Sequence, residues 1–158
     1  MKVLIASDHA GFELKSKLIP FLKEMDYEVL DKGAFKFDAN DDYPDFVIPV
    51  ASEISLSNDD IKGIILGGSG QGEAICANRF PNVRAVVFNG QYEPKDGREV
   101  PREIILSREH NNANILSLGA RFLNEDEAKK AVKTWLNTAF SEDPRHVRRI
   151  AKIEAINK

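Results

Sequence analysis

One stretch of the sequence decides the fold: Gly63-Ile64-Ile65-Leu66-Gly67-Gly68-Ser69-Gly70-Gln71-Gly72-Glu73. An apolar run passes here into a glycine-rich turn and then into a segment with helical composition. Near-continuous apolar runs are typical of strands in a parallel sheet that is covered on both faces. Glycines after such a strand let backbone N–H groups face an anion, and a following helix N-terminus adds partial positive charge. We therefore expect a strand, an anion-binding or oxyanion-binding turn and a helix.

The same alternation runs along the whole chain. Four further apolar runs with β-branched residues predict strands at Val3–Ala6, Tyr27–Leu30, Val83–Phe88 and Asn114–Leu118. Helical periodicity lies between them, at Gly11–Met25, Tyr43–Ser57, Glu73–Phe80 and Glu125–Phe140, and a last helix begins at Asp143-Pro144. Strands that alternate with helices predict an α/β protein, a three-layer α/β/α sandwich with a Rossmann-like five-stranded parallel sheet. We expect one domain over residues 1–158, and the strand order stays open.

Two helices carry local signals. Asn124 precedes the helix at Glu125, and Glu127 three residues later completes a capping-box pattern. Pro20 lies inside the first predicted helix, where it removes a backbone N–H donor, so we expect a kink or an early end there.

Composition excludes several classes of protein. The 158 residues are 42% hydrophobic and 30% charged, which is ordinary for a globular chain. The formal net charge of −3 argues against a nucleic-acid surface, and no apolar run approaches the roughly 18 to 20 residues of a membrane helix. The single cysteine, Cys76, cannot form an internal disulfide, which favours a reducing compartment. We expect a cytoplasmic protein with no nucleic-acid or membrane partner.

Polar groups follow the predicted strands at their carboxyl ends. They are Ser7-Asp8-His9-Ala10-Gly11, the glycine-rich loop with Glu73, Glu109-His110-Asn111 and Gly119-Ala120-Arg121. Ligands of open parallel sheets bind at this edge, so we expect these groups to form a site. Simpler interpretations stay open: the loop as a tight turn, Glu73 as a residue favoured by the helix dipole, and Asp8-His9 as a helix cap and a satisfied histidine. No His/Cys cluster has metal-ligand spacing, so no metal site is expected.

A basic patch lies near the C-terminus. Arg145 and Arg149 are four residues apart and share one helix face, with Arg148 beside them. Guanidinium groups match phosphate oxygens, so the patch is either a phosphate clamp or a solvated helix face.

The motifs together resemble the ribose-5-phosphate isomerase type B family, which includes the galactose-6-phosphate isomerase subunits. The resemblance covers nearly the whole chain. It rests on Ser7–Phe12, Asp42–Asp45, Gly67–Glu73, Ala77–Arg79, Arg84-Ala85, Glu109–Asn114, Gly119–Arg121 and Arg145-His146-x-x-Arg149. It implies an aldose–ketose isomerase that works through a cis-enediolate without metal or organic cofactor.

The resemblance also implies which residue is the base. Many family members use a cysteine at the end of the third strand, where this chain has Gly67. Another branch has glycine there and a glutamate after the loop, and this chain is similar to that branch. Glu73 is therefore the implied base, and Cys76 is expected to face the core.

The remaining roles are implied in the same way. Ser69 and the backbone N–H groups of Gly70–Gly72 would hold the enediolate, with Gly68 and Gln71 in the same substrate-binding loop. His110 would assist ring opening. The other implied substrate ligands are Asp8 and Asn111 for sugar oxygens, Tyr43 for the pocket wall, and His9, Arg121, Arg145 and Arg149 for the phosphate. In the family the C-terminal arginines reach into a neighbouring subunit, which implies a homodimer or a dimer of dimers with shared sites.

The substrate stays open among three alternatives. The first is interconversion of ribose 5-phosphate and ribulose 5-phosphate, and the second is isomerisation of a six-carbon sugar phosphate such as galactose or allose 6-phosphate. The third is a non-catalytic phosphosugar or nucleotide sensor. The irregular segment Asn89–Pro101 is longer than is usual for the family. Its extra charges, with Arg102, would alter the choice of sugar or lengthen an interface: Asp96, Arg98 and Glu99.

Overall fold

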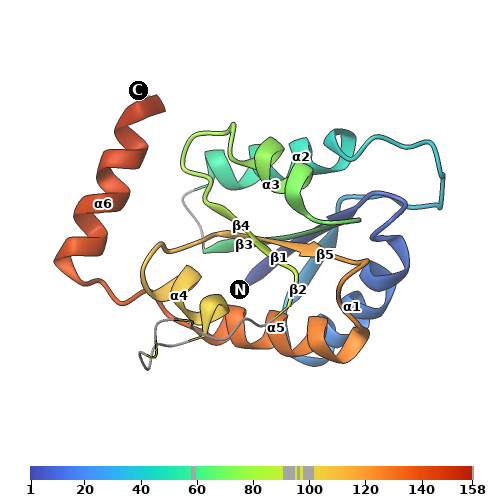
Figure 1. The fold of residues 1–158 in the computed structure, drawn as a ribbon. Coiled ribbons are helices and arrows are strands. Elements are labelled where there is room, and N and C mark those ends of the chain that lie inside the picture. Colours follow the sequence, from blue (N-terminus) through green and yellow to red (C-terminus); the bar gives the residue numbers. More distant parts are fainter. Residues whose placement is uncertain (58–59, 91–94, 96, 98–101, 158) are drawn as a thin grey trace.

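A five-stranded parallel sheet forms the centre of the molecule, as predicted (Figure 1). The computed structural model describes residues 1–57, 60–90, 95, 97 and 102–157. The strands are β1 (Lys2–Ser7), β2 (Glu28–Asp31), β3 (Ile61–Gly67), β4 (Ala85–Phe88) and β5 (Ile115–Gly119). Their order is β2-β1-β3-β5-β4, and all neighbours are parallel. β3 therefore lies at the centre, and its carboxyl end is flanked by those of β1 and β5.

Helices cover both faces of the sheet and give the three predicted layers (Figure 1). One face is covered by α2 (Pro44–Leu56) and α3 (Gln71–Ala77). The other is covered by α1 (Phe12–Glu24), α4 (Glu103–Glu109) and α5 (Glu125–Asn137). Helix α6 (Pro144–Glu154) stands apart at one side, followed by the 3-10 turn Ala155–Asn157.

The apolar runs are continuous because each strand residue meets one of two cores. Ile64 and Leu66 face the core beneath α1 and α5, where Trp135 is fully buried. Ile65 faces the other core, against Val50 of α2 and Ala77 of α3. Alternate side chains point to opposite faces of a strand, so both sets must be apolar when both faces are covered.

The two local signals had different outcomes. The capping box is confirmed: Asn124 Oδ1 accepts the Glu127 N–H at 2.9 Å, and Glu127 Oε2 accepts the Asn124 N–H at 2.9 Å. The expected interruption at Pro20 is wrong in that α1 continues to Glu24. An interior proline costs about 3 kcal/mol of helix stability. The buried stripe of Leu14, Leu18 and Leu22 spans the proline and offsets that cost by packing on the sheet.

Two segments differ from the expectation or go beyond it. Helix α4 was not predicted, because its seven residues give too short a periodic pattern to be told from the long loop before it. Of the extra charges expected near that loop, Asp96, Arg98 and Glu99 lie outside the described residues. No helix in the described part of the chain has the length and apolarity to cross a membrane.

Helix α6 is joined to its own chain near its end. Glu154 pairs with Arg84, Oε1 to Nη1, at 2.6 Å, and its Oε2 accepts the Asn82 N–H at 3.1 Å. Val147 and Ile153 of this helix and Ile156 beyond it are exposed. Helix α6 and the turn after it therefore expose apolar side chains on the surface of the chain.

The capping box yields a stability prediction. Asn124→Ala removes the side-chain acceptor at the start of α5, so the free energy of unfolding should fall by about 1 kcal/mol, measured by urea denaturation. Lys133→Ala, at an exposed position of the same helix, should stay within about 0.5 kcal/mol of wild type. Equal stability of the two variants would contradict the role of the cap.

Candidate active site

Three strand-end segments meet at the carboxyl edge of the sheet and are joined by backbone hydrogen bonds. The Ala120 N–H donates to Gly67 O at 2.8 Å, and the Arg121 N–H donates to Gly68 O at 3.1 Å. The Asp8 N–H donates to Leu66 O at 3.3 Å. The ends of β1 and β5 therefore hold the glycine-rich loop from both sides, which fixes the positions of the side chains around it.

The loop turns sharply at Gly70, the residue before α3. Gly70 has a φ of +74°, and a Cβ there would lie 2.9 Å from Ser117 Oγ. The Ser117 hydroxyl donates to Gly70 O at 2.6 Å. Only glycine adopts this backbone conformation without strain while packing so closely on β5. The turn directs the first N–H groups of α3, which lack partners inside the helix, towards the strand ends.

Glu73 lies in the first turn of α3 and occupies the space beside Gly67. A Cβ at position 67 would overlap Oε1 and Cδ of the Glu73 carboxylate and would lie 2.8 Å from Oε2. Any side chain at position 67 would therefore displace this carboxylate. Gly67 is therefore the residue that makes room for Glu73.

Burial changes the acidity of Glu73. Its side chain is only 4% exposed, and this desolvation raises its pKa above the ordinary glutamate value of 4.5. A hydrogen bond from its own backbone N–H lowers the pKa, and the negative charge of nearby Asp8 raises it. Burial dominates, so the carboxylate holds a proton more strongly than a free glutamate. A raised carboxyl pKa is a property that suits a general base near neutral pH.

An open cavity of about 320 Å³ lies over this carboxylate. The predicted residues that it brings together are Asp8, His9, Tyr43, Gly68, Ser69, Gly72, Glu73 and Arg121, and Ala10 and Phe122 complete its wall. Asp8 is 7% exposed, and its Oδ1 accepts the N–H groups of Ala10 and Gly11 at 2.9 and 3.1 Å. Asp8 therefore fixes the turn after β1 as well as lining the cavity.

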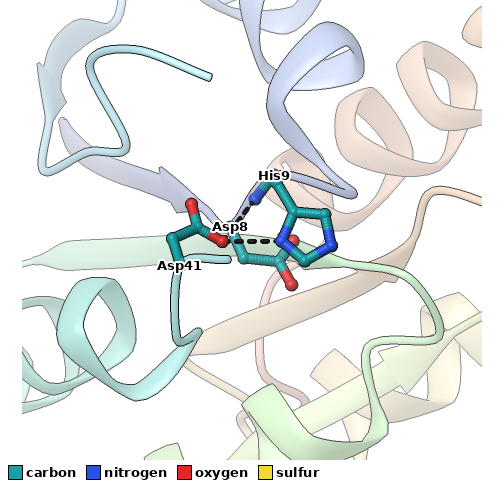
Figure 2. Close-up of side chains that lie close together, drawn as sticks. All are labelled: Asp8, His9 and Asp41. Atoms are coloured by element: carbon teal, nitrogen blue, oxygen red, sulfur yellow. Dashed lines mark hydrogen bonds and ion pairs between the residues drawn. The ribbon is translucent and has the colours of Figure 1, made fainter. Parts of the chain in front are cut away.

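The cavity has a cationic end formed by Arg121 and His9. The Arg121 guanidinium lies over Gly68, where it would be 3.1 Å from a Cβ. His9 Nδ1 lies 2.6 Å from Oδ1 of Asp41 (Figure 2). This hydrogen bond is the main reason that the pKa of His9 is raised above 6.5, and the negative charges of Asp8 and Asp41 add to it. Burial and the charge of Arg121 act in the opposite direction.

The sequence analysis did not identify Asp41. It lies 32 residues after His9, in the segment between β2 and α2, and no local pattern links the two. Asp8, His9 and Asp41 offer ligand atoms within 4.8 Å of one another, a grouping that could hold a metal ion. However, His9 Nδ1 is bonded to Asp41, and Asp8 Oδ1 accepts two N–H groups. These hydrogen bonds account for the grouping without an ion.

The other predicted site residues do not line this cavity. Gln71 faces a separate groove with Ile75 and Arg79, and Gly70 is buried against β5. Asn111 lines a groove between α4 and β4. Arg145 and Arg149 are exposed on α6.

His110 is paired with the beginning of α6. Its ring stacks on that of His146, with centroids 4.1 Å apart and planes at 14°. His146 is 3% exposed, and its burial, followed by the positive charges of His110 and Arg145, lowers its pKa. Arg145 Nε donates to His146 Nε2 at 3.2 Å. His110 and the arginine-bearing helix therefore form one unit on the surface of the chain.

Cys76 is half-buried against the core between α2, α3 and the sheet, which agrees with the expectation that it faces the core. Burial raises the pKa of its thiol, and the charge of Glu73 raises it further. Cys76 is thus a poor source of thiolate, and Glu73 is the better base of the two.

This site defines a class of protein. A buried carboxylate and cationic side chains line one cavity at the carboxyl ends of parallel strands. That arrangement suits proton transfer on a small anionic ligand.

Comparison with known proteins identifies the family. The sequence pattern of the ribose/galactose isomerase family matches residues 3–153. Ribose-5-phosphate isomerase B of Mycolicibacterium paratuberculosis is 41% identical over 150 residues, which are 95% of this chain and 87% of that protein. The chain therefore belongs to the ribose/galactose isomerase family.

Solved structures agree with this assignment. Ribose-5-phosphate isomerase B of Clostridium thermocellum superposes with a TM-score of 0.87 at 40% identity, covering 99% of this chain and 97% of that one. The enzyme from Mycoplasma genitalium, solved with bound ribulose-5-phosphate, gives a TM-score of 0.88 at 36% identity, covering 99% and 95%.

The raised pKa of Glu73 predicts how stability depends on pH. A carboxyl with a higher pKa in the folded state contributes stability at pH values below its unfolded pKa. That contribution is lost as the pH rises through the folded pKa. Glu73→Gln is neutral at every pH, so its melting temperature should exceed that of wild type by a margin that grows from pH 4 to pH 8.

Calorimetry at a series of pH values measures this margin, at roughly 2 to 4 °C for each kcal/mol. Glu24→Gln, which removes an exposed carboxylate at the end of α1, is the matched control and should show a much smaller change. A margin for Glu73→Gln that is constant or that shrinks with pH would contradict the burial effect.

Proposed function

We propose that this chain interconverts ribose 5-phosphate and ribulose 5-phosphate, with Glu73 as the base. One observation carries the proposal: the Glu73 carboxylate is buried in the space left by Gly67 and lines a cavity that His9 and Arg121 also line. Relatives named ribose-5-phosphate isomerase B support the choice of sugar. The enzyme would act in the cytoplasm, which the single unpaired cysteine supports.

The chemistry needs one group that serves two neighbouring carbons. Glu73 would take the proton from C2 of the open-chain aldose, and the C–H electron pair would form the double bond of a cis-enediolate. In the same step the π pair of the C1 carbonyl would move onto O1, and the proton of the O2 hydroxyl would pass to O1. The same carboxyl would then return its proton to C1 while O2 becomes the ketose carbonyl. A carboxylate held at one point above C1 and C2 can perform both transfers.

The developing negative charge needs hydrogen-bond donors that are already in place. Ser69 lines the cavity, and its Oγ lies 3.4 Å from the Gln71 N–H, at the start of α3. The backbone N–H groups of Gly70–Gly72 form the turn beneath the cavity. We assign these groups to the enediolate oxygens, because fixed donors stabilise a charge that forms only during the reaction.

The phosphate would lie at the cationic end. His9 and Arg121 supply two positive groups from one chain. Asp8 also lines the cavity and would accept hydrogen bonds from sugar hydroxyls, while Tyr43 closes the wall beside Gly72. With the phosphate bound by His9 and Arg121, the glycine-rich loop would bind the enediolate oxygens.

A second subunit would complete the site. His110 stacks on His146 at the start of α6. If α6 reaches a partner subunit, both histidines would therefore lie near the same cavity of that partner. We propose that His110, Asn111, Arg145 and Arg149 act in the partner's cavity, because none of them lines the cavity of its own chain. The assembly would be a homodimer or a dimer of such dimers, and the exposed apolar side chains of α6 suit an interface.

A coupled assay tests the reaction and the base together. Wild-type protein should convert ribose 5-phosphate and act weakly or not at all on allose 6-phosphate and galactose 6-phosphate. Glu73→Gln should lower kcat by about a thousandfold, the range of general-base catalysis, while the Kd for ribose 5-phosphate by calorimetry changes little.

Each outcome separates the alternatives. Turnover of the six-carbon sugars alone would replace the pentose as substrate. Binding without turnover by the wild type would favour a sensor. Full activity of Glu73→Gln would exclude Glu73 as the base.

Mixing two inactive variants tests the shared site. If Arg149 acts in the partner's cavity, each site takes its base from one subunit and its Arg149 from the other. Glu73→Gln and Arg149→Ala then remove residues that different subunits contribute to a site. After equal amounts are unfolded and refolded together, half of the dimers would be mixed and one site in each would be intact. Activity should then return to about one quarter of the wild-type value.

A matched pair controls this experiment. Glu73→Gln mixed with Arg121→Ala should recover nothing beyond the sum of the two, because both residues line one cavity. If the mixture of Glu73→Gln and Arg149→Ala also recovers no activity, Arg149 does not act in the partner's cavity, and the basic patch of α6 is a solvated helix face.

A further inference from the structure

Asp41 makes two hydrogen bonds to one residue through a single oxygen. Its Oδ1 lies 2.6 Å from His9 Nδ1 and accepts the His9 backbone N–H at 3.0 Å (Figure 2). The imidazole and the backbone of His9 are thus fixed by the same carboxylate atom. Figure 2 shows the second carboxylate oxygen pointing away from the ring and from Asp8.

The burial of Asp41 indicates that this contact is more than a surface ion pair. The Asp41 side chain is 9% exposed, and its buried Oδ2 has no hydrogen-bond partner among the residues that the structure describes. Burying a carboxylate with an unpaired oxygen is costly, so the bonds from Oδ1 must offset much of the loss. The His9 side chain remains 29% exposed and open to the cavity.

The hydrogen bond also decides what the ring can offer to an anion. The Asp41 carboxylate can only accept a hydrogen bond, so it favours a proton on Nδ1 and leaves Nε2 as the free nitrogen. In a neutral ring of that tautomer, Nε2 is an acceptor and would repel phosphate oxygen. In the imidazolium form, Nε2–H is a donor with a positive charge, which is the form that binds phosphate.

We propose that Asp41 is a positioning residue that holds His9 in one orientation and as a cation, with Nε2–H directed at the substrate's phosphate. The inference rests on the proposed function, which supplies the phosphate. Asp41 acts only through His9 and does not itself touch the substrate.

The charges around His9 agree in sign with this role. Asp41 and Asp8 favour the imidazolium, and Arg121 and burial oppose it. The ring also meets the edge of Phe37, at 6.4 Å between centroids, which contributes no charge. Removing the charge of Asp41 would leave Arg121 and burial opposed by Asp8 alone, so the pKa of His9 should fall.

Asp41→Asn is the decisive variant, because it keeps the shape and an acceptor oxygen but removes the charge. KM for ribose 5-phosphate should rise about fivefold to tenfold at pH 8, as expected for weakening one charge-assisted bond, with kcat within about twofold. The KM ratio should be smaller at pH 6 than at pH 8, because the His9 of the variant gains its proton as the pH falls. Asp38→Asn, which removes an exposed charge from the same segment, is the matched control and should match wild type at both pH values.

Two further measurements do not depend on activity. Nuclear magnetic resonance titration of the His9 imidazole should show a lower pKa in Asp41→Asn than in wild type and in Asp38→Asn. In the wild-type protein alone, nitrogen chemical shifts should show a protonated Nδ1. A neutral ring protonated only at Nε2 would overturn the proposal even if the variant failed to fold.

The outcomes separate this proposal from the proposed function. An unchanged His9 pKa, or a KM ratio that is flat between pH 6 and pH 8, would overturn the role of Asp41. Asp41→Asn should also add nothing in a His9→Asn background, and an added loss there would contradict action through His9. Absence of ribose 5-phosphate turnover by wild type would instead sink the proposed function, while the titration would still decide the Asp41–His9 coupling.

Discussion

The Glu73 carboxylate occupies the space that a side chain at position 67 would fill, and the rest of the site depends on this arrangement. The carboxylate can lie over the end of the central strand only because Gly67 has no Cβ. The glycine-rich loop turns the chain sharply enough to place Glu73 in the first turn of the next helix. Burial at this point raises the pKa of the carboxyl, which lowers stability at neutral pH and suits the proposed role of Glu73 as the base.

The sheet order explains how Glu73 lies close to side chains that are far from it in the sequence. β3 lies between β1 and β5, so their carboxyl ends bring Asp8, Glu73 and Arg121 to one cavity. The cavity is lined by the carboxylates of Glu73 and Asp8 and by the cationic groups of His9 and Arg121. In the proposed function a sugar phosphate would bind with its reacting carbons near Glu73 and its phosphate towards His9 and Arg121. Arg145 and Arg149 would complete the positive end from a second copy.

Much of this could be predicted from local sequence patterns. Five apolar runs gave the strands, and Asn124 with Glu127 gave the start of α5 to the residue. Strand order, the continuation of α1 through Pro20 and the short helix α4 depended on packing or on patterns too short to interpret. Asp41 was missed because its link to His9 exists only in three dimensions. His110 was expected in the same site as Glu73. It does not line the cavity of its own chain but stacks on His146 at the start of α6, so its place in the site stays a prediction for the partner's cavity.

The most direct test is to measure kcat in variants that move the base from position 73 to position 67. A thiol at position 67 and the carboxylate of Glu73 cannot occupy the same space. In Glu73→Ala, however, the space is free, and Gly67→Cys could place a new base there. The account predicts that the double variant has a higher kcat for ribose 5-phosphate than Gly67→Cys or Glu73→Ala alone. A double variant no more active than Glu73→Ala, or a Gly67→Cys single variant with wild-type kcat, would contradict it.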